Sequence, residues 1–335
     1  MRRTAAGRAE HKLRGSRTIR AAADKVPHVQ TVGEVPLRPA AMRSFRSTVW
    51  EYWKKHGRHD LAWRKTNNPY RIMISEVMLQ QTQVPRVKEK YKEFLKAFPN
   101  VRALAKAPLS KVLQVWSGLG YNRRAKFLHD AAKEIVRKHR GRVPLLYSEL
   151  VELPGIGDYT ASAIRVFAFN EPDVLIETNV RAAFIHHFYT QNRHKVSDRE
   201  LLRYIAVAAE DQDPRKWHSA LMDYGVHLKK LHKNPARKSA HYVRQSKFEG
   251  SLRQVRGAIL RAHAKQTSMN AVRNEFPDRF DEAFRSLVRD GLITKSALLH
   301  DAQELSRDRG SQMLFVSRNS RRPLPQRSRR LSKAT

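Results

Sequence analysis

The chain has 335 residues, of which 41% are hydrophobic, so it is long enough for about two domains with a sizeable core. Its 66 Lys and Arg outnumber 31 Asp and Glu, and a formal net charge of +35 is typical of proteins that bind a polyanion. The sequence contains no cysteine, which excludes disulfides, thiolate nucleophiles and Cys-ligated zinc or iron–sulfur sites. It also lacks an apolar run of the ~18 residues that span a membrane, so we expect a soluble intracellular protein.

The two ends of the chain differ from its body. Residues 1–43 and 301–335 lack hydrophobic periodicity and are rich in Arg, so we expect basic disordered tails. Such tails are either simply solvated or add non-specific affinity for a polyanion. Between about 44 and 228 apolar residues recur at helical spacing, which predicts a mostly α-helical domain.

Prolines, glycines and capping residues mark the ends of the expected helices. Asn68-Pro69 begins one helix and Pro85 another, while Gly141 ends a segment that starts near residue 122. Ser197 and Glu200 form a capping-box pattern at the start of a later helix.

The composition and the helical periodicity of the chain change after residue 228. Residues 229–248 are rich in Lys and Arg, which indicates a linker or a phosphate-facing loop. Residues 249–300 contain three helical stretches and then Gly291-Leu292-Ile293-Thr294, the order of helices and strand in a winged helix. A small helical cap without a ligand fits this pattern equally well.

A Pro-Gly turn, Leu153-Pro154-Gly155-Ile156-Gly157, separates helical stretches at 147–153 and 158–169. The glycines permit positive φ and a close backbone approach, so N–H groups at the start of the second helix can meet a phosphate. Ile156 would anchor the turn in the core. Alone, such a turn is usually an ordinary connection, but in so basic a chain it predicts a helix-hairpin-helix that binds DNA.

Glu76 has an unusual position for an acid. Its neighbours at three and four residues include Ile72, Met73, Leu79 and Gln80, so it lies on the face that should be buried. Desolvation raises a carboxyl pKa, which suits a general acid near neutral pH. The alternative is a Glu at the edge of an apolar stripe that pairs with an Arg.

A second acid, Glu177, follows the apolar run Val174-Leu175-Ile176 where a helix is expected to begin. A helix N-terminus favours the ionised form, so we expect Glu177 to be an anion. A protonated donor and an anion together suit cleavage of a glycosidic bond. Simple helix capping by Glu177 is the alternative.

Residues 60–228 are similar to the helix-hairpin-helix DNA glycosylase (HhH-GPD) superfamily, and specifically to its adenine-specific mismatch (MutY-type) branch. The similar motifs, in the family's order, are Leu61-Ala62-Trp63-Arg64, Pro69-Tyr70, Ser75-Glu76-Val77-Met78-Leu79-Gln80-Gln81-Thr82-Gln83, Gly118-Leu119-Gly120-Tyr121, Leu153-Pro154-Gly155-Ile156-Gly157 and Ala220-Leu221-Met222-Asp223. The resemblance implies an all-α, two-domain fold and a target base that is flipped out of the duplex.

The resemblance also implies roles for four catalytic residues. Glu76 matches the acid that protonates the adenine ring and activates water, and Glu177 aligns with the family's catalytic aspartate. Asn179 matches a polar residue that supports the second carboxylate. Tyr159 stands where bifunctional relatives carry a Schiff-base lysine, so a monofunctional enzyme is expected.

Further residues are implied to contact DNA. Gln80 and Tyr121 match residues that wedge into the duplex, and Arg64 matches the start of the base pocket. The full set of expected DNA-binding residues is Arg64, Gln80, Gln81, Tyr121, Pro154, Gly155, Ile156, Gly157, Lys229, Lys230 and Lys233.

Two departures affect the site. Glu177 is longer than the family's aspartate by a methylene, which shifts the carboxylate by roughly 1 Å and costs on the order of 100-fold unless the backbone compensates. The four cysteines of the family's iron–sulfur loop align with Lys229, Ala236, Ser239 and Gln245, so no iron–sulfur cluster, other cofactor or metal is expected. The lysines of this loop would bind phosphate by charge.

A third departure concerns the C-terminal part of the chain. The family's Nudix-like domain, which reads the oxidised guanine opposite adenine, is not recognisable after residue 250. His227, His232 and His241 could replace the cluster ligands, but their spacing fits no standard metal site.

Together these patterns predict a monofunctional base-excision-repair glycosylase that removes adenine mispaired with guanine or 8-oxoguanine and leaves an abasic site. Its partner would be double-stranded DNA with a mismatch or an oxidised base, and we expect a monomer in the cytoplasm, associated with the nucleoid. The alternatives are a thymine or uracil mismatch glycosylase, a catalytically weakened protein that binds DNA damage, and a bifunctional lyase.

Overall fold

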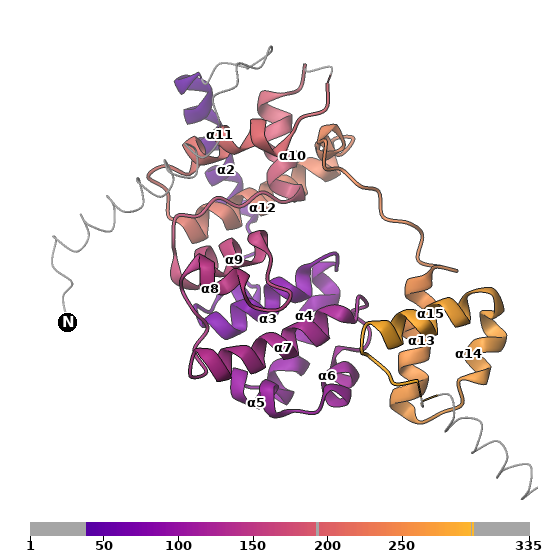
Figure 1. Ribbon diagram of the computed structural model, residues 1–335. Coiled ribbons are helices and arrows are strands. Elements are labelled where there is room, and N and C mark those ends of the chain that lie inside the picture. The colour runs from indigo at the N-terminus through magenta and orange to yellow at the C-terminus, as the bar shows by residue number, and fades with distance from the viewer. Residues whose placement is uncertain (1–37, 192–193, 296, 298–335) are drawn as a thin grey trace, which may run out of the picture. The chain divides into compact units, whose positions relative to one another are not determined.

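A computed structural model describes residues 38–191, 194–295 and 297, and these form two compact units that divide between Lys247 and Phe248 (Figure 1). Within the described residues, an isolated bridge between Val196 and Ser239 is the sole β-pairing. The prediction of an all-α fold is therefore confirmed. None of the described helices is both long and apolar enough to cross a membrane.

The first unit has two main clusters of buried apolar side chains. The first cluster is formed by α3 (Pro69–Leu79), α4 (Val84–Ala97), α5 (Val101–Lys106), α6 (Leu109–Trp116), α7 (Arg123–Lys138), α8 (Tyr147–Val151) and α9 (Asp158–Ile164), with the short 3-10 helix η1 (Ala62–Arg64). The second cluster is formed by α2 (Pro39–His56), α10 (Thr178–Phe188), α11 (Asp198–Ala209) and α12 (Pro214–Leu231). This unit also contains the short helix η3 (Pro235–Lys238).

Several predicted helix ends are confirmed. The Asn68 side chain accepts a hydrogen bond from the Arg71 N–H at 3.1 Å and caps α3, which begins at Pro69. Ser197 and Glu200 form both bonds of a capping box at the start of α11. Pro85 lies in the first turn of α4, where its missing N–H costs nothing.

Two boundaries differ from the expectation. The first helix begins at Pro39, inside the predicted tail, because Met42 already belongs to the helical apolar stripe and is only 5% exposed. The predicted helix at 158–169 is α-helical up to Ile164 and then forms the π-type turn η2 (Arg165–Phe169). The remainder of the predicted N-terminal tail and all of the C-terminal tail lie outside the described residues.

The second unit contains α13 (Leu252–Lys265), α14 (Asn270–Glu275) and α15 (Pro277–Arg289). Ile259 and Phe280 are fully buried between these helices, and Arg256 pairs with Asp290 at 2.6 Å. The three helices agree with the winged-helix order, but residues 291–294 form a turn and bends instead of the expected strand. Leu292 and Ile293 are buried, which explains the apolar pattern that suggested a strand.

Candidate active site

The Pro-Gly turn connects α8 to α9, and its two glycines differ. Gly155 has φ +75°, and a Cβ placed on it would lie 2.5 Å from the Phe127 Cβ, so both its backbone conformation and its neighbour require glycine. Gly157 has φ −90° and does not use the positive φ that glycine permits. A Cβ on Gly157 would meet no atom within 4 Å, which leaves its backbone open to a ligand. Ile156 is 3% exposed and anchors the turn in the first cluster, as predicted.

The start of α9 presents backbone donors beside this turn. The first backbone hydrogen bond of the helix runs from the Ala161 N–H to the Gly157 carbonyl at 2.9 Å. The preceding N–H groups of α9 therefore have no helical partner and are available to an anion. The Tyr147 hydroxyl donates to Asp158 at 2.8 Å and fixes the first residue of the helix.

Glu76 is buried in the middle of α3, as its spacing predicts. The side chain is 7% exposed, and its carboxyl group accepts no hydrogen bond from the residues that the structure describes. Burial, and next the charge of Glu177, raise the pKa of Glu76 to about 8, while Arg64 opposes the rise. At neutral pH the group is consequently protonated and can donate.

Glu177 caps the N-terminus of α10. One carboxylate oxygen accepts the N–H groups of Asn179 and Val180 at 2.8 and 2.9 Å, and the other accepts the Asn179 side-chain amide at 3.0 Å. The predicted N-terminal contacts are thus present. Burial nevertheless outweighs these bonds and the Lys229 charge, so the pKa of Glu177 is raised, whereas the helix N-terminus alone favours the ionised form.

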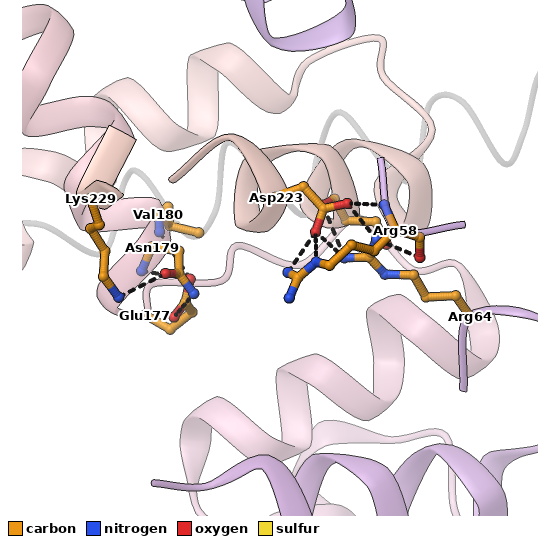
Figure 2. Close-up of polar contacts among 8 residues, drawn as sticks. Arg58, Arg64, Glu177, Asn179, Val180, Asp223 and Lys229 are labelled. Atoms are coloured by element: carbon orange, nitrogen blue, oxygen red, sulfur yellow. Dashed lines mark hydrogen bonds and ion pairs between the residues drawn. The ribbon is translucent and has the colours of Figure 1, made fainter. Parts of the chain in front are cut away.

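Lys229 points toward this carboxylate and not toward an exposed phosphate-binding face. Its ammonium donates to the Asn179 side-chain oxygen at 3.0 Å, as Figure 2 shows. Lys230 and Lys233 are exposed. The DNA contacts of Lys230 and Lys233 stay a prediction, whereas Lys229 is engaged elsewhere.

Tyr159 lies near both acids. It packs against the small apolar cluster that includes Ile72 and Leu175. Burial, then the charges of Glu76 and Glu177, hold the pKa of its phenol well above the ordinary value of 10.0. The structure thus brings together a neutral acid, a second carboxylate and a neutral phenol, which can donate a proton and stabilise a cation.

Comparisons with known proteins identify the family of the chain. The profile of the HhH-GPD superfamily base excision DNA repair proteins matches residues 74–206. The adenine DNA glycosylase of Mycolicibacterium smegmatis is 32% identical over 269 residues, which cover 73% of this chain and 91% of that protein. The chain belongs to the HhH-GPD superfamily.

Other HhH-GPD proteins match smaller parts of the chain. The adenine DNA glycosylase of Buchnera aphidicola subsp. Baizongia pistaciae is 37% identical over 182 residues, which cover 54% of this chain and 52% of that protein. The chain therefore aligns with about half the length of that relative. The solved structure of a thermostable thymine-DNA glycosylase superposes with a TM-score of 0.50 at 26% identity, covering 56% of this chain and 86% of that one.

Arg64, expected at the start of the base pocket of this HhH-GPD protein, is held by Asp223 (Figure 2). Its guanidinium donates to the two Asp223 oxygens at 2.6 and 2.9 Å, and Arg58 donates to the same carboxylate at 2.6 Å. Burial alone would raise the pKa of Asp223, but the two arginines lower it. Asp223 therefore stays ionised and fixes Arg64 close enough to influence Glu76.

The predicted wedge residues lie in two turns that one arginine joins. Gln81 and Tyr121 have φ of +53° and +48°, and Gln80 donates to Thr160 at 3.2 Å. The Arg124 guanidinium donates to oxygens at the end of α3 and in both turns. These are Val77 O at 2.8 Å, Met78 O at 3.0 Å, Thr82 Oγ1 at 3.0 Å, Gly120 O at 3.2 Å and Leu119 O at 3.3 Å. Sequence reasoning did not find Arg124, because its partners meet only in the folded chain.

The basic loop at 229–248 is held without cysteine, so a cysteine-ligated cluster cannot be present. The Val196 N–H donates to the Lys238 carbonyl and the Ala240 N–H to the Val196 carbonyl, both at 2.8 Å. Ala236 and Ser239, which align with two of the family's cysteines, are buried at 1% and 2% exposure. His227, His232 and His241 belong to no group that could bind a metal among the described residues.

Proposed function

We propose that this protein is a monofunctional DNA glycosylase that removes adenine mispaired with guanine or 8-oxoguanine and leaves an abasic site. The observation that carries the proposal is Glu76, a buried carboxyl group with a pKa of about 8, beside the capped carboxylate of Glu177. Adenine as the target is supported by the similarity to the adenine DNA glycosylase of Mycolicibacterium smegmatis.

In the proposed reaction Glu76 donates its proton to the ring of an adenine that is flipped out of the duplex. The N-glycosidic bond then breaks, and its electron pair leaves with the base. The Glu177 carboxylate stabilises the positive charge on the sugar, and the ionised Glu76 takes a proton from the water that adds to the sugar. Asn179 holds Glu177 in place for this role.

Tyr159 supports a monofunctional reaction. A Schiff base with the sugar needs an amine, and the phenol of Tyr159 remains neutral at physiological pH. We therefore expect no strand cleavage coupled to base release.

Binding to mismatched DNA would use the open backbone of the hairpin together with basic side chains. Residues proposed to contact phosphate are Gly155, Gly157, Lys230 and Lys233, with Pro154 and Ile156 shaping the turn. The turns that carry Gln80, Gln81 and Tyr121 would enter the duplex beside the flipped base.

The test is a panel of duplexes that carry A:8-oxoG, A:G, T:G or U:G, incubated with the protein and divided before alkali treatment. We expect alkali-dependent cleavage at adenine in the first two duplexes and no cleavage without alkali. If neither adenine duplex is cleaved, the adenine assignment is wrong. Nicking without alkali, together with a borohydride-trapped adduct, would contradict the monofunctional reaction.

A thymine or uracil mismatch glycosylase is the second candidate, which the similarity to a thymine-DNA glycosylase structure favours. It predicts cleavage of the T:G or U:G duplex alone. The longer side chain of Glu177 supports a third candidate, a weakened protein that binds damage. That candidate predicts binding to mismatched duplexes without release of any base.

A further inference from the structure

We propose that Lys229 is a positioning residue that orients the Asn179 amide and so holds the Glu177 carboxylate in place. The proposal rests on the proposed function, since it assigns Lys229 a part in the same reaction. It replaces the phosphate-binding role that the charge of the loop suggested for this lysine.

The hydrogen bonds form a short chain with a fixed direction. Lys229 donates to the Asn179 Oδ1 at 3.0 Å, and the Asn179 Nδ2 donates to Glu177 at 3.0 Å (Figure 2). An ammonium group can only donate and a carboxylate can only accept. If the Asn179 amide were rotated by a half turn, its NH₂ group would face the Lys229 ammonium, and its oxygen would face the Glu177 carboxylate. Neither pair could form a hydrogen bond. Lys229 therefore selects the amide orientation that supports Glu177.

The packing of α10 on α12 brings the lysine within reach. A Cβ placed on Gly225 would lie 2.0 Å from the Asn179 backbone oxygen, so the two helices approach as closely as glycine allows. Lys229 follows Gly225 by four residues on α12 and thus lies one turn further along the same face. The close packing of the two helices therefore places the Lys229 ammonium next to the Asn179 side chain.

The charges around Glu177 give Lys229 a second effect. Glu76 from α3 and Tyr159 from α9 face Glu177, and Arg181 lies on its own helix. Arg181 is engaged by Asp198 through two bonds of 2.7 Å. Lys229 has no such carboxylate partner among the described residues, and its charge opposes the rise in the pKa of Glu177 that burial causes.

The kinetic test uses the full chain and whichever panel duplex the wild type cleaves. Single-turnover base release is measured from about pH 5 to about pH 9 for Lys229→Met, Lys229→Arg and Lys216→Met. Lys216 is an exposed lysine on the same helix, so its variant loses the same charge away from the site. If Lys229→Met does not fold, Lys229→Gln, which keeps a donor without the charge, takes its place.

We expect Lys229→Met to lower the rate at neutral pH by about 10-fold or more, since a misplaced carboxylate stabilises the sugar cation poorly. The acid limb of its pH profile should move to higher pH, because the pKa of Glu177 loses a lowering charge. Lys229→Arg should recover the wild-type profile, and Lys216→Met should match the wild type. Lys229→Met with the wild-type rate and profile would overturn the proposal, as would a slower rate with an unchanged profile.

A second measurement separates this inference from the proposed function. The ¹³C-labelled Glu177 carboxyl signal, assigned by its loss in Glu177→Gln, is titrated in the free protein. Its midpoint should be higher in Lys229→Met than in the wild type and Lys216→Met. Equal midpoints would contradict the role of Lys229 even if the enzyme is active. If the wild type releases no base from any duplex, the proposed function fails and this titration still decides the inference.

Discussion

Glu76 lies inside a helix among apolar side chains, whereas Glu177 lies at a helix start among N–H groups, an amide and an ammonium. The first environment offers the carboxyl group no hydrogen-bond partner among the residues that the structure describes, and it favours the protonated form. The second offers three hydrogen bonds that favour the charge. Burial raises the pKa of both carboxyl groups, but at Glu177 hydrogen bonds and the Lys229 charge oppose the rise.

The two environments also differ in how many residues they require. Burial of Glu76 needs only an apolar face on α3, which tolerates many combinations of side chains. The contacts of Glu177 need the start of α10, Asn179, Lys229 and the close packing at Gly225. We therefore expect the second carboxyl group to be the more sensitive to changes outside the site.

Glu76→Gln should have the largest effect. The amide cannot donate an acidic proton or activate water, so we expect base release to fall by about 10³-fold, within the range for a lost general acid. Single-turnover assays on the A:8-oxoG duplex measure this, with binding to the uncleaved duplex as the control. A rate equal to the wild type would remove Glu76 from the mechanism.

Glu177→Gln should have the next largest effect. The amide keeps an oxygen for the N–H groups of Asn179 and Val180 but loses the charge that stabilises the sugar cation. We expect a loss of about 10²-fold in the single-turnover rate. Should this variant retain full activity, Glu177 would serve only as the cap of α10.

The hairpin glycines should respond differently to alanine. Gly155→Ala adds a Cβ at positive φ against Phe127, and we expect a loss of about 1–3 kcal/mol in the free energy of unfolding. Gly157→Ala meets open space, so stability should change by no more than about 0.5 kcal/mol while DNA affinity falls. Urea unfolding and duplex binding measure the two effects. Equal losses of stability in the two variants would contradict the different surroundings of Gly155 and Gly157.

The stability should also depend on pH through Glu76. Glu76 binds its proton more tightly in the folded chain, with a pKa of about 8 against an ordinary 4.5, so folding becomes less favourable as pH rises between these values. Glu76→Gln should remove this loss, so its stability relative to the wild type should increase by up to about 1.4 kcal/mol per pH unit. Urea unfolding at several pH values checks this, and a difference that does not vary with pH would contradict the raised pKa.

Local sequence signals predicted much of the site. The spacing around Glu76 placed it on a buried face, and the position of Glu177 after an apolar run placed it at a helix start; both placements are confirmed. The Pro-Gly turn with its anchored Ile156 is confirmed as well. These features depend on residues within a few positions of one another, which the sequence displays directly.

Features that depend on distant segments were not predicted. The pKa of Glu177 is raised because the folded chain buries it, which its helix position alone does not reveal. The direction of Lys229 follows from the close approach at Gly225, and the sequence showed only a charge in a basic loop. Residues 291–294 form a turn and bends, and Leu292 and Ile293 are buried there without the expected strand.

Arg124 gives the two wedge-bearing turns a common anchor. Because one guanidinium holds both turns, a displacement of either one strains the hydrogen bonds of the other. Gln80 and Tyr121 should then enter and leave a duplex as a single mechanical unit, and the energetic effects of substituting them should not add.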